Sequence, residues 1–168
     1  MGVNYPSQNP LPFEMKIDLR DCSNSDANFV FGLIEATMKC YIIKTWGKWD
    51  NAFVWSEVTA ICNTRDAKII RIGGEDAGLV HYGRHPTHIQ LEHLYIAPSH
   101  QNLGFGTRLL QDLMAEAQRG RIPLRLRVLE SNPARALYER LEFIVTEATA
   151  TRFFLAYQPR SMSNRPVF

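Results

Sequence analysis

The stretch HQNLGFGTRLL, residues 100–110, sets two glycines directly ahead of an apolar run with helical spacing. Backbone N–H groups at a helix N-terminus have no partner within the helix and carry partial positive charge. Glycines let a phosphate approach such groups closely. The stretch is therefore either a phosphate-binding loop or a plain turn from a strand into a helix. It lacks the Gly-Lys-Ser/Thr of one nucleotide-binding loop and the third glycine and later acid of another.

The segments on both sides of this stretch show strand-like and helix-like patterns in turn. Period-two alternation predicts half-buried strands, and apolar residues three and four apart predict amphipathic helices. Gly120 is expected to end the helix that follows the glycines. The predicted order is a strand over 13–19, a helix after Ser23 and Ser25 to about 46, a helix over 50–62, strands over 67–72, 77–82 and 88–96, a helix over 104–119, a strand over 123–129, a short helix from 132, and strands over 143–145 and 152–157. This order predicts one α+β domain with a mostly antiparallel sheet.

Length and charge limit the organisation and the partners of the chain. Its 168 residues suit a single domain over 13–157, with an extended arm over 1–12 and a polar tail over 158–168. The formal net charge of +2 is too small to indicate a nucleic-acid partner.

The cysteines and the apolar segments indicate a compartment. Cys22, Cys40 and Cys62 are odd in number and far apart, as expected for reduced thiols rather than a disulfide framework. No apolar run approaches the roughly 18 residues of a membrane span, and no secretory signal is recognisable. We therefore expect a cytoplasmic protein without a membrane partner.

Two motifs in the right order give the sequence a family resemblance. Residues 91–106, LEHLYIAPSHQNLGFG, run from an apolar strand through a proline into Gln101, Gly104 and Gly106. Residues 132–143, NPARALYERLEF, follow after a predicted helix and strand. Together they resemble the two signatures of the GCN5-related N-acetyltransferases, the GNAT family. Glu142 replaces the family's usual glycine, which costs on the order of 1 kcal/mol where a left-handed conformation is required.

The resemblance implies a GNAT-like fold, a mixed, mostly antiparallel twisted sheet of about seven strands flanked by about four helices. It also implies an acetyl-CoA-dependent N-acetyltransferase with acetyl-CoA as co-substrate. In the family, backbone groups at the end of the strand before the loop bind the pantetheine arm, and the loop amides hold the pyrophosphate. Carried over, the acetyl-CoA-binding residues are Leu94, Tyr95, Ile96, Gln101, Asn102, Leu103, Gly104, Phe105, Gly106, Thr107, Asn132 and Tyr138.

Tyr138 and Glu92 are the catalytic candidates. Tyr138 matches the family's general acid, which protonates the departing CoA thiolate; it could also be a half-buried aromatic residue of an amphipathic helix. Glu92 and His93, on the strand before the loop, are candidates for taking the proton of the amine, whereas the resemblance implies an acid slightly earlier, where this chain has Gln90. A base acting through water, or no dedicated base, is the alternative. Period-two counting puts Glu92 on one face with Leu94 and Ile96, unless a bulge intervenes.

The acceptor site is expected in the connection between the first two helices, where the family places it. There Trp46, Trp49 and Asp50 could form an aromatic wall with a carboxylate for an ammonium group. The tryptophans could instead pack the corner between the helices.

Four histidines fall in one predicted hairpin, where pairing could set His81 near Glu92 and His85 near His88. No cysteine spacing or HExxH pattern accompanies them, so the sequence predicts no metal site.

Three functions are consistent with these features. The first is transfer of an acetyl group to a primary amine of a small molecule or of a protein or peptide. The second is a GNAT-like module that senses acyl-CoA without turnover. The third is an interaction protein, or a homodimer, whose terminal arms make the contacts.

Overall fold

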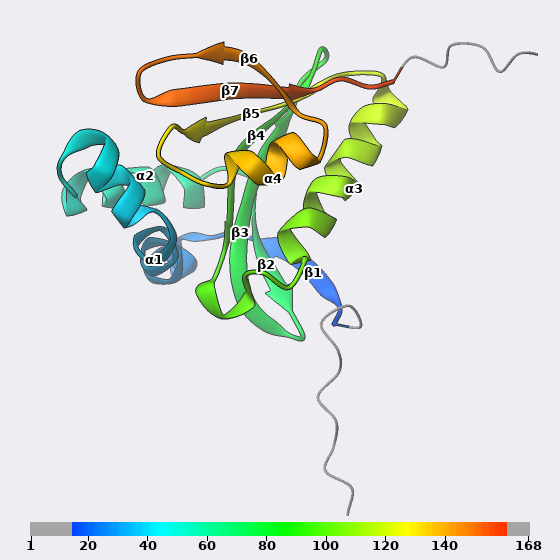
Figure 1. Cartoon of the computed structure of the whole chain (residues 1–168). Coiled ribbons are helices and arrows are strands. Elements are labelled where there is room, and N and C mark those ends of the chain that lie inside the picture. The colour runs from blue at the N-terminus through cyan, green and yellow to red at the C-terminus, as the bar shows by residue number, and fades with distance from the viewer. Residues whose placement is uncertain (1–14, 161–168) are drawn as a thin grey trace, which may run out of the picture.

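The computed structural model describes residues 15–160, and the arm over 1–12 and residues 161–168 of the tail lie outside the described residues. Seven strands and four α-helices follow one another in the predicted order (Figure 1). Two 3₁₀ turns, Asn24–Asp26 and Pro98–His100, complete the structure. The strands are β1 Ile17–Asp21, β2 Ala67–Ile72, β3 Glu75–Arg84, β4 Ile89–Ile96, β5 Leu124–Leu129, β6 Ile144–Ala148 and β7 Arg152–Tyr157, and the helices are α1 Ala27–Trp46, α2 Asn51–Cys62, α3 Phe105–Gly120 and α4 Arg135–Arg140.

All seven strands form one sheet in the order β1-β2-β3-β4-β5-β7-β6. Every neighbouring pair is antiparallel except β4 and β5, which are parallel. Helix α3 connects these two strands, because a parallel pair needs a crossover connection. The predicted α+β class with a mostly antiparallel sheet is confirmed.

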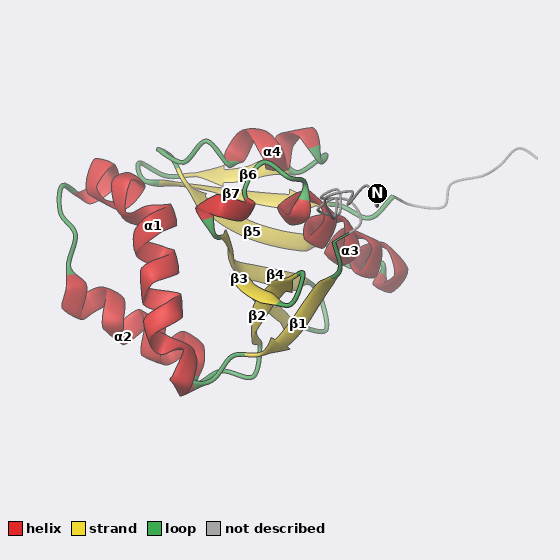
Figure 2. Cartoon of the chain, turned by 90° about the horizontal axis from the view of Figure 1, so that it is seen from below, coloured by secondary structure: helices red, strands yellow, loops and turns green. Residues whose placement is uncertain are grey.

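The helices cover both faces of the sheet, so the protein has two apolar cores. Helices α1 and α2 pack on one face with Val30, Leu33, Val58 and Leu79 among the buried residues (Figure 2). Helices α3 and α4 pack on the other face. Among the residues buried there are Ile70, Val80, Leu91, Leu110, Leu124 and Phe143. Within residues 15–160, no helix is both long and apolar enough to cross a membrane.

The helix ends agree with their predicted signals in two places. Gly47 ends α1 with φ +78°, a left-handed conformation that glycine adopts without strain. Asp50 caps α2, since its side chain accepts a hydrogen bond of 3.1 Å from the N–H of Phe53.

The end of α3 differs from the prediction by one residue. Gly120 is the last helical residue, and the left-handed position is Arg121, with φ +53°. The N–H of Ile122 donates to the carbonyl of Ala117, which closes the turn. A Cβ at position 120 would lie 3.3 Å from Cγ1 of Ile122. A glycine therefore suits this position because of the close contact, and not because of a left-handed conformation.

Candidate active site

Strands β4 and β5 separate part-way along their length. They pair only from Ile89–Leu124 to Leu91–Leu126, although β4 continues to Ile96 and β5 to Leu129. Beyond Leu91, the edge of β4 that faces β5 therefore has no strand partner. Such an edge presents backbone N–H and C=O groups to any extended ligand that enters the gap.

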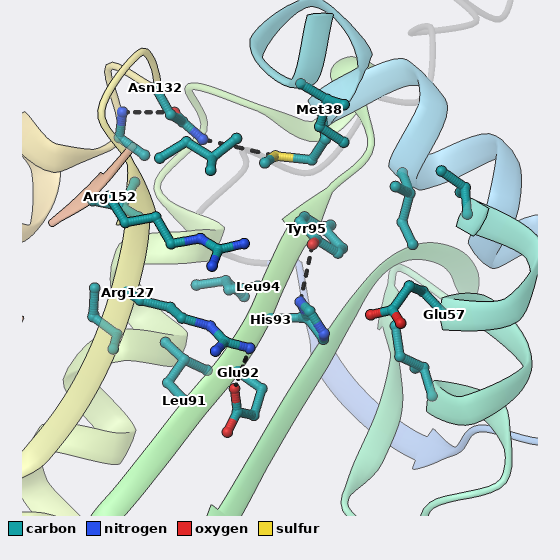
Figure 3. A pocket seen from close by; sticks show the side chains of 18 of the residues that line it. Met38, Glu57, Leu91, Glu92, His93, Leu94, Tyr95, Arg127, Asn132 and Arg152 are labelled. Carbon is teal, nitrogen blue, oxygen red and sulfur yellow. Dashed lines mark hydrogen bonds and ion pairs between the residues drawn. The ribbon is translucent and has the colours of Figure 1, made fainter. Parts of the chain in front are cut away.

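A cavity of about 250 Å³ fills this gap and continues under α1 and α2 (Figure 3). Its walls come from both helices, from the diverging strands, from α4 and from the start of β7. The lining residues are Ile34, Met38, Ile42, Trp46, Phe53, Val54, Glu57, Ile61, Leu91, Glu92, His93, Leu94, Tyr95, Leu126, Arg127, Val128, Leu129, Asn132, Ala134, Tyr138 and Arg152.

A β-bulge at Glu92 sets the direction of the β4 side chains. His81 lies opposite His93 and Tyr82 opposite Leu91, so Glu92 is an extra residue on β4. One oxygen of Glu92 lies 3.2 Å from Nη2 of Arg127. Arg127 alternates with Leu126 and Val128, which face the α3 side of the sheet. Glu92 therefore points to the α1 and α2 side.

The bulge changes two expectations from the sequence. Leu94 and Ile96 pack against the α3 core, so Glu92 does not share their face as unbroken alternation predicts. His81 lies opposite His93 instead of Glu92. The other histidine pair is confirmed, because the rings of His85 and His88 stack with centroids 4.6 Å apart.

His93 and Tyr95 form a buried polar pair on the cavity floor. The Tyr95 hydroxyl lies 3.0 Å from Nδ1 of His93. Burial, with smaller contributions from the neighbouring His81 and Arg127, lowers the pKa of His93 to about 4. Burial also raises the pKa of Tyr95. Both side chains are therefore uncharged at neutral pH.

Tyr138 projects from α4 toward the cavity. Burial raises the pKa of its hydroxyl to about 12, so the phenol is protonated at neutral pH. Its ring meets that of Phe143 edge-on at 5.8 Å. The N–H of Phe143 also donates to the Tyr138 carbonyl, which closes the last turn of α4.

Asn132 begins the approach to α4 as a capping residue. Its Oδ1 accepts a hydrogen bond of 2.9 Å from the N–H of Ala134, and its Nδ2 lies 3.7 Å from the sulfur of Met38. Asn132 thereby connects the β5–α4 loop to α1 at the rim of the cavity.

The glycine loop, residues 100–106, forms the turn from β4 into α3. Asn102 and Gly104 both have positive φ, +60° and +85°; asparagine and glycine are the residues that adopt this conformation at least cost. The N–H groups of Phe105, Gly106 and Thr107 form the first helical turn and have no partner within the helix. The side chain of Gln101 donates to the carbonyl of Ile96 at 2.8 Å, which fastens the loop to the end of β4.

Gly106 leaves unused space beside these N–H groups. A Cβ at this position would meet no atom of the chain closer than Cγ1 of Ile96, at 3.9 Å, which is an ordinary contact. The fold itself therefore does not require a glycine there. A phosphate held close to the loop amides would require one, so the loop fits the pyrophosphate of a nucleotide-containing ligand.

The three residues expected to bind the acceptor occupy different places. Trp46 lines the cavity and is 46% exposed. Trp49 packs edge-on against Phe31 at 6.3 Å and does not line the cavity. Asp50 is the cap of α2, so the structure brings only Trp46 to the cavity.

The part of the chain between residues 15 and 160 contains no three histidine, cysteine, aspartate or glutamate side chains placed to share a metal ion.

A family model described as "Acetyltransferase (GNAT) domain" matches residues 59–145. The matched range runs from α2 into β6 and includes the split strands, the glycine loop and Tyr138. The chain belongs to the GNAT acetyltransferase family. A search of curated protein sequences finds no match.

Solved structures of GNAT acetyltransferases share the fold. The PaiA N-acetyltransferase from Thermoplasma acidophilum, in complex with coenzyme A, is 16% identical with a TM-score of 0.65 over 86% of this chain and 99% of that chain. An acetyltransferase from Thermus thermophilus is 18% identical with a TM-score of 0.67, covering 85% and 97%. The ribosomal-protein-S18-alanine N-acetyltransferase from Escherichia coli is 18% identical with a TM-score of 0.61, covering 91% and 99%.

Three charged residues of this GNAT site were missed by sequence reasoning: Glu57, Arg127 and Arg152. Each lines the cavity, but each comes from a segment outside the two family signatures. Glu57 precedes the buried Val58 on α2. The sequence places it beside the core but does not show which other segment its side chain faces. Arg152 opens β7, whose register against β5 decides where it lies.

Proposed function

We propose that this protein is an acetyl-CoA-dependent N-acetyltransferase that acts on a primary amine of a small molecule or of a protein or peptide. The observation that carries the proposal is the free edge of β4, which leads from the glycine loop to the cavity beside Tyr138. Membership of the GNAT family and the coenzyme A complex of the Thermoplasma relative support the same reading.

Acetyl-CoA supplies an activated acetyl thioester. The N–H groups from Asn102 to Thr107 would hold its pyrophosphate, with Gly106 leaving room for the phosphate oxygens. The backbone of Leu94, Tyr95 and Ile96 would bind the extended pantetheine arm along the free edge of β4. Gln101 would act indirectly, because its amide holds the loop on the carbonyl of Ile96.

Tyr138 would be the general acid. A leaving thiolate needs a proton, and the Tyr138 phenol, with a pKa of about 12, is fully protonated and able to donate at neutral pH. Asn132 would support the site by fixing the loop before α4, through its bond to the N–H of Ala134.

Either Glu92 or His93 would accept the amine proton. The bulge turns both side chains toward the cavity, and burial keeps the imidazole of His93 unprotonated at neutral pH. The ion pair with Arg127 occupies one oxygen of Glu92. The other oxygen is left for the amine or for a bridging water.

Trp46 would form part of the acceptor wall directly, and Trp49 and Asp50 would support it by fixing the turn into α2. The hydrogen bond from Trp49 Nε1 to Asn51 and the cap made by Asp50 both stabilise this turn. Its position decides how Phe53 and Val54 line the cavity.

The test is acetyl-CoA turnover with a panel of amines, followed by detection of free thiol and by mass spectrometry of the product. We expect a mass increase of one acetyl group on at least one amine. Glu92→Gln and His93→Gln, assayed from pH 5 to pH 10, identify the base, since the true base variant loses roughly 100-fold in turnover while the other does not. Binding of acetyl-CoA without acetylation of any amine would instead make the protein an acyl-CoA sensor.

A further inference from the structure

The cavity carries opposite charges on opposite walls. Arg127 of β5 and Arg152 of β7 extend their guanidinium groups into it from one side, and Glu57 of α2 faces it from the other (Figure 3). His93 and Tyr95 lie on the floor between these walls. A ligand that contacts both walls carries a positive group and a negative group.

The two arginines differ in whether a carboxylate of the protein already binds the guanidinium group. Arg127 is paired with Glu92 at 3.2 Å. Arg152 has no carboxylate within 4 Å among the residues that the structure describes; its guanidinium carbon lies 5.4 Å from the centroid of the Trp46 ring. A guanidinium that stacks on an aromatic ring keeps its N–H donors free, and its planar fork matches a carboxylate. Arg152 is therefore available to bind an anion.

Glu57 provides the complementary charge close to the floor of the cavity. Its side chain lines the cavity from α2 and faces the His93–Tyr95 pair (Figure 3). An ammonium group there would be held between the Glu57 carboxylate and the His93–Tyr95 pair. From that position the amine can pass its proton to His93 or Glu92.

Apart from Asn132 and Tyr138, the remaining surface of the cavity is apolar. The side chains between the charged walls are Ile34, Met38, Ile42, Phe53, Val54 and Ile61. They come from α1 and α2 and leave no polar partner for a hydroxyl or amide on the ligand. This part of the cavity fits an aliphatic group.

We propose that the acceptor is a small zwitterionic amine, a free α-amino acid with an aliphatic side chain, and that Arg152 recognises its carboxylate. The inference rests on the proposed acetyltransferase function and names the acceptor of that same site. The amine nitrogen forms a bond to the acetyl carbon as the carbon–sulfur bond of acetyl-CoA breaks. The bound ammonium loses one proton to the base before it attacks and a second proton as the amide forms, and the thiolate gains one from Tyr138. The Tyr138 phenolate recovers one of the two protons, and the other is released to solvent. The products are the N-acetyl amino acid and CoA.

Three matched amines test the proposal: L-leucine, L-leucinamide and 3-methylbutylamine, which share the aliphatic group and differ in the carboxylate. The protein should acetylate leucine with a kcat/KM at least about tenfold above the other two, as expected for a charge-assisted, bidentate contact. Arg152→Gln should remove this preference, and Arg152→Lys should retain part of it. Arg65→Gln, at an exposed position outside the cavity, serves as the matched control.

The ratio between substrates is measured within each variant, so partial misfolding of a variant does not imitate the result. Equal or better acetylation of leucinamide and 3-methylbutylamine by the native protein would overturn this inference and leave the proposed function intact. An unchanged preference in Arg152→Gln would overturn it too. Acetylation of none of these amines, nor of any peptide in the panel, would overturn the proposed function itself.

Discussion

At the scale of single residues, burial decides which side chains can exchange protons. Tyr138, His93 and Tyr95 all lie against apolar neighbours, and burial stabilises the uncharged form of each. The phenol of Tyr138 is therefore protonated at neutral pH and can donate its proton. The imidazole of His93 is unprotonated at neutral pH, although it is a weak base.

Tyr138→Phe tests the general acid. Turnover should fall roughly 100-fold, because the variant lacks the proton donor, while affinity for acetyl-CoA stays within about threefold. In the native protein the pKa of about 12 predicts no loss of activity from Tyr138 ionisation below about pH 11. Tyr157→Phe is the control, since that hydroxyl bonds to Gln118 away from the cavity. Equal losses in both variants would contradict the assignment.

Glu142 tests the cost of a left-handed residue. The sequence predicts this strain from the missing glycine, and the structure confirms it with φ +67°. Glu142→Gly should raise the free energy of unfolding by about 1 kcal/mol in urea denaturation. The substitution also removes the exposed ion pair with Arg160, so Arg160→Gln measures that loss separately. A Glu142→Gly protein no more stable than Arg160→Gln would show that the turn is not strained.

At the scale of elements, one arginine joins three segments at the start of α1. Arg20 of β1 binds both oxygens of Asp26, at 2.8 and 3.0 Å, and also binds Asp76 of β3. Asp26 is buried and accepts hydrogen bonds from Ser23 as well. The helix start is thereby fixed to the edge of the sheet.

This arrangement predicts a loss of stability in acid. The bond to Arg20 lowers the pKa of Asp26 to about 2 from an ordinary value of 3.8. The folded protein therefore gains roughly 2 kcal/mol from this carboxylate above about pH 4, and the gain disappears as the pH falls through about 2. Asp26→Asn should be less stable by that amount at pH 7, and the difference should shrink by about half at pH 3 in chemical denaturation.

Asp18→Asn, which changes a partly exposed carboxylate on β1, the strand of Arg20, is the control for the acid series and should show little effect. A difference between native protein and Asp26→Asn that stays constant from pH 7 to pH 3 would mean that Asp26 is not held in its charged form by Arg20.

How far the sequence predicts each element depends on whether the signal is local. Gly47 and Asp50 mark helix ends through their own conformations, and both predictions are confirmed. The bulge at Glu92 arises from the pairing of β4 with β3, which no local pattern in β4 records. The end of α3 differs by one residue although its signal is local, because the left-handed position falls on Arg121 rather than on Gly120.

At the scale of the whole molecule, the site exists because two packed halves diverge. Residues of α1 and α2 form one core and residues of α3 and α4 the other, and the sheet between them opens where β4 leaves β5. The family signatures predict the loop and Tyr138 on the α3 side. Glu57 and Arg152, on opposite walls of the cavity, come from segments far apart in the sequence, so their meeting could only be found in the structure.

The central claim is that the glycine loop binds the pyrophosphate of acetyl-CoA, and calorimetric titration with acetyl-CoA tests it most directly. Gly106→Val is compared with Gly32→Val, at an exposed position of α1 where a Cβ meets no atom within 4 Å. Both variants should keep their melting temperature within about 5 °C of the native protein. Only Gly106→Val should lose at least about tenfold in affinity for acetyl-CoA. Binding by Gly106→Val as tight as by the native protein, or no binding by the native protein, would contradict this claim.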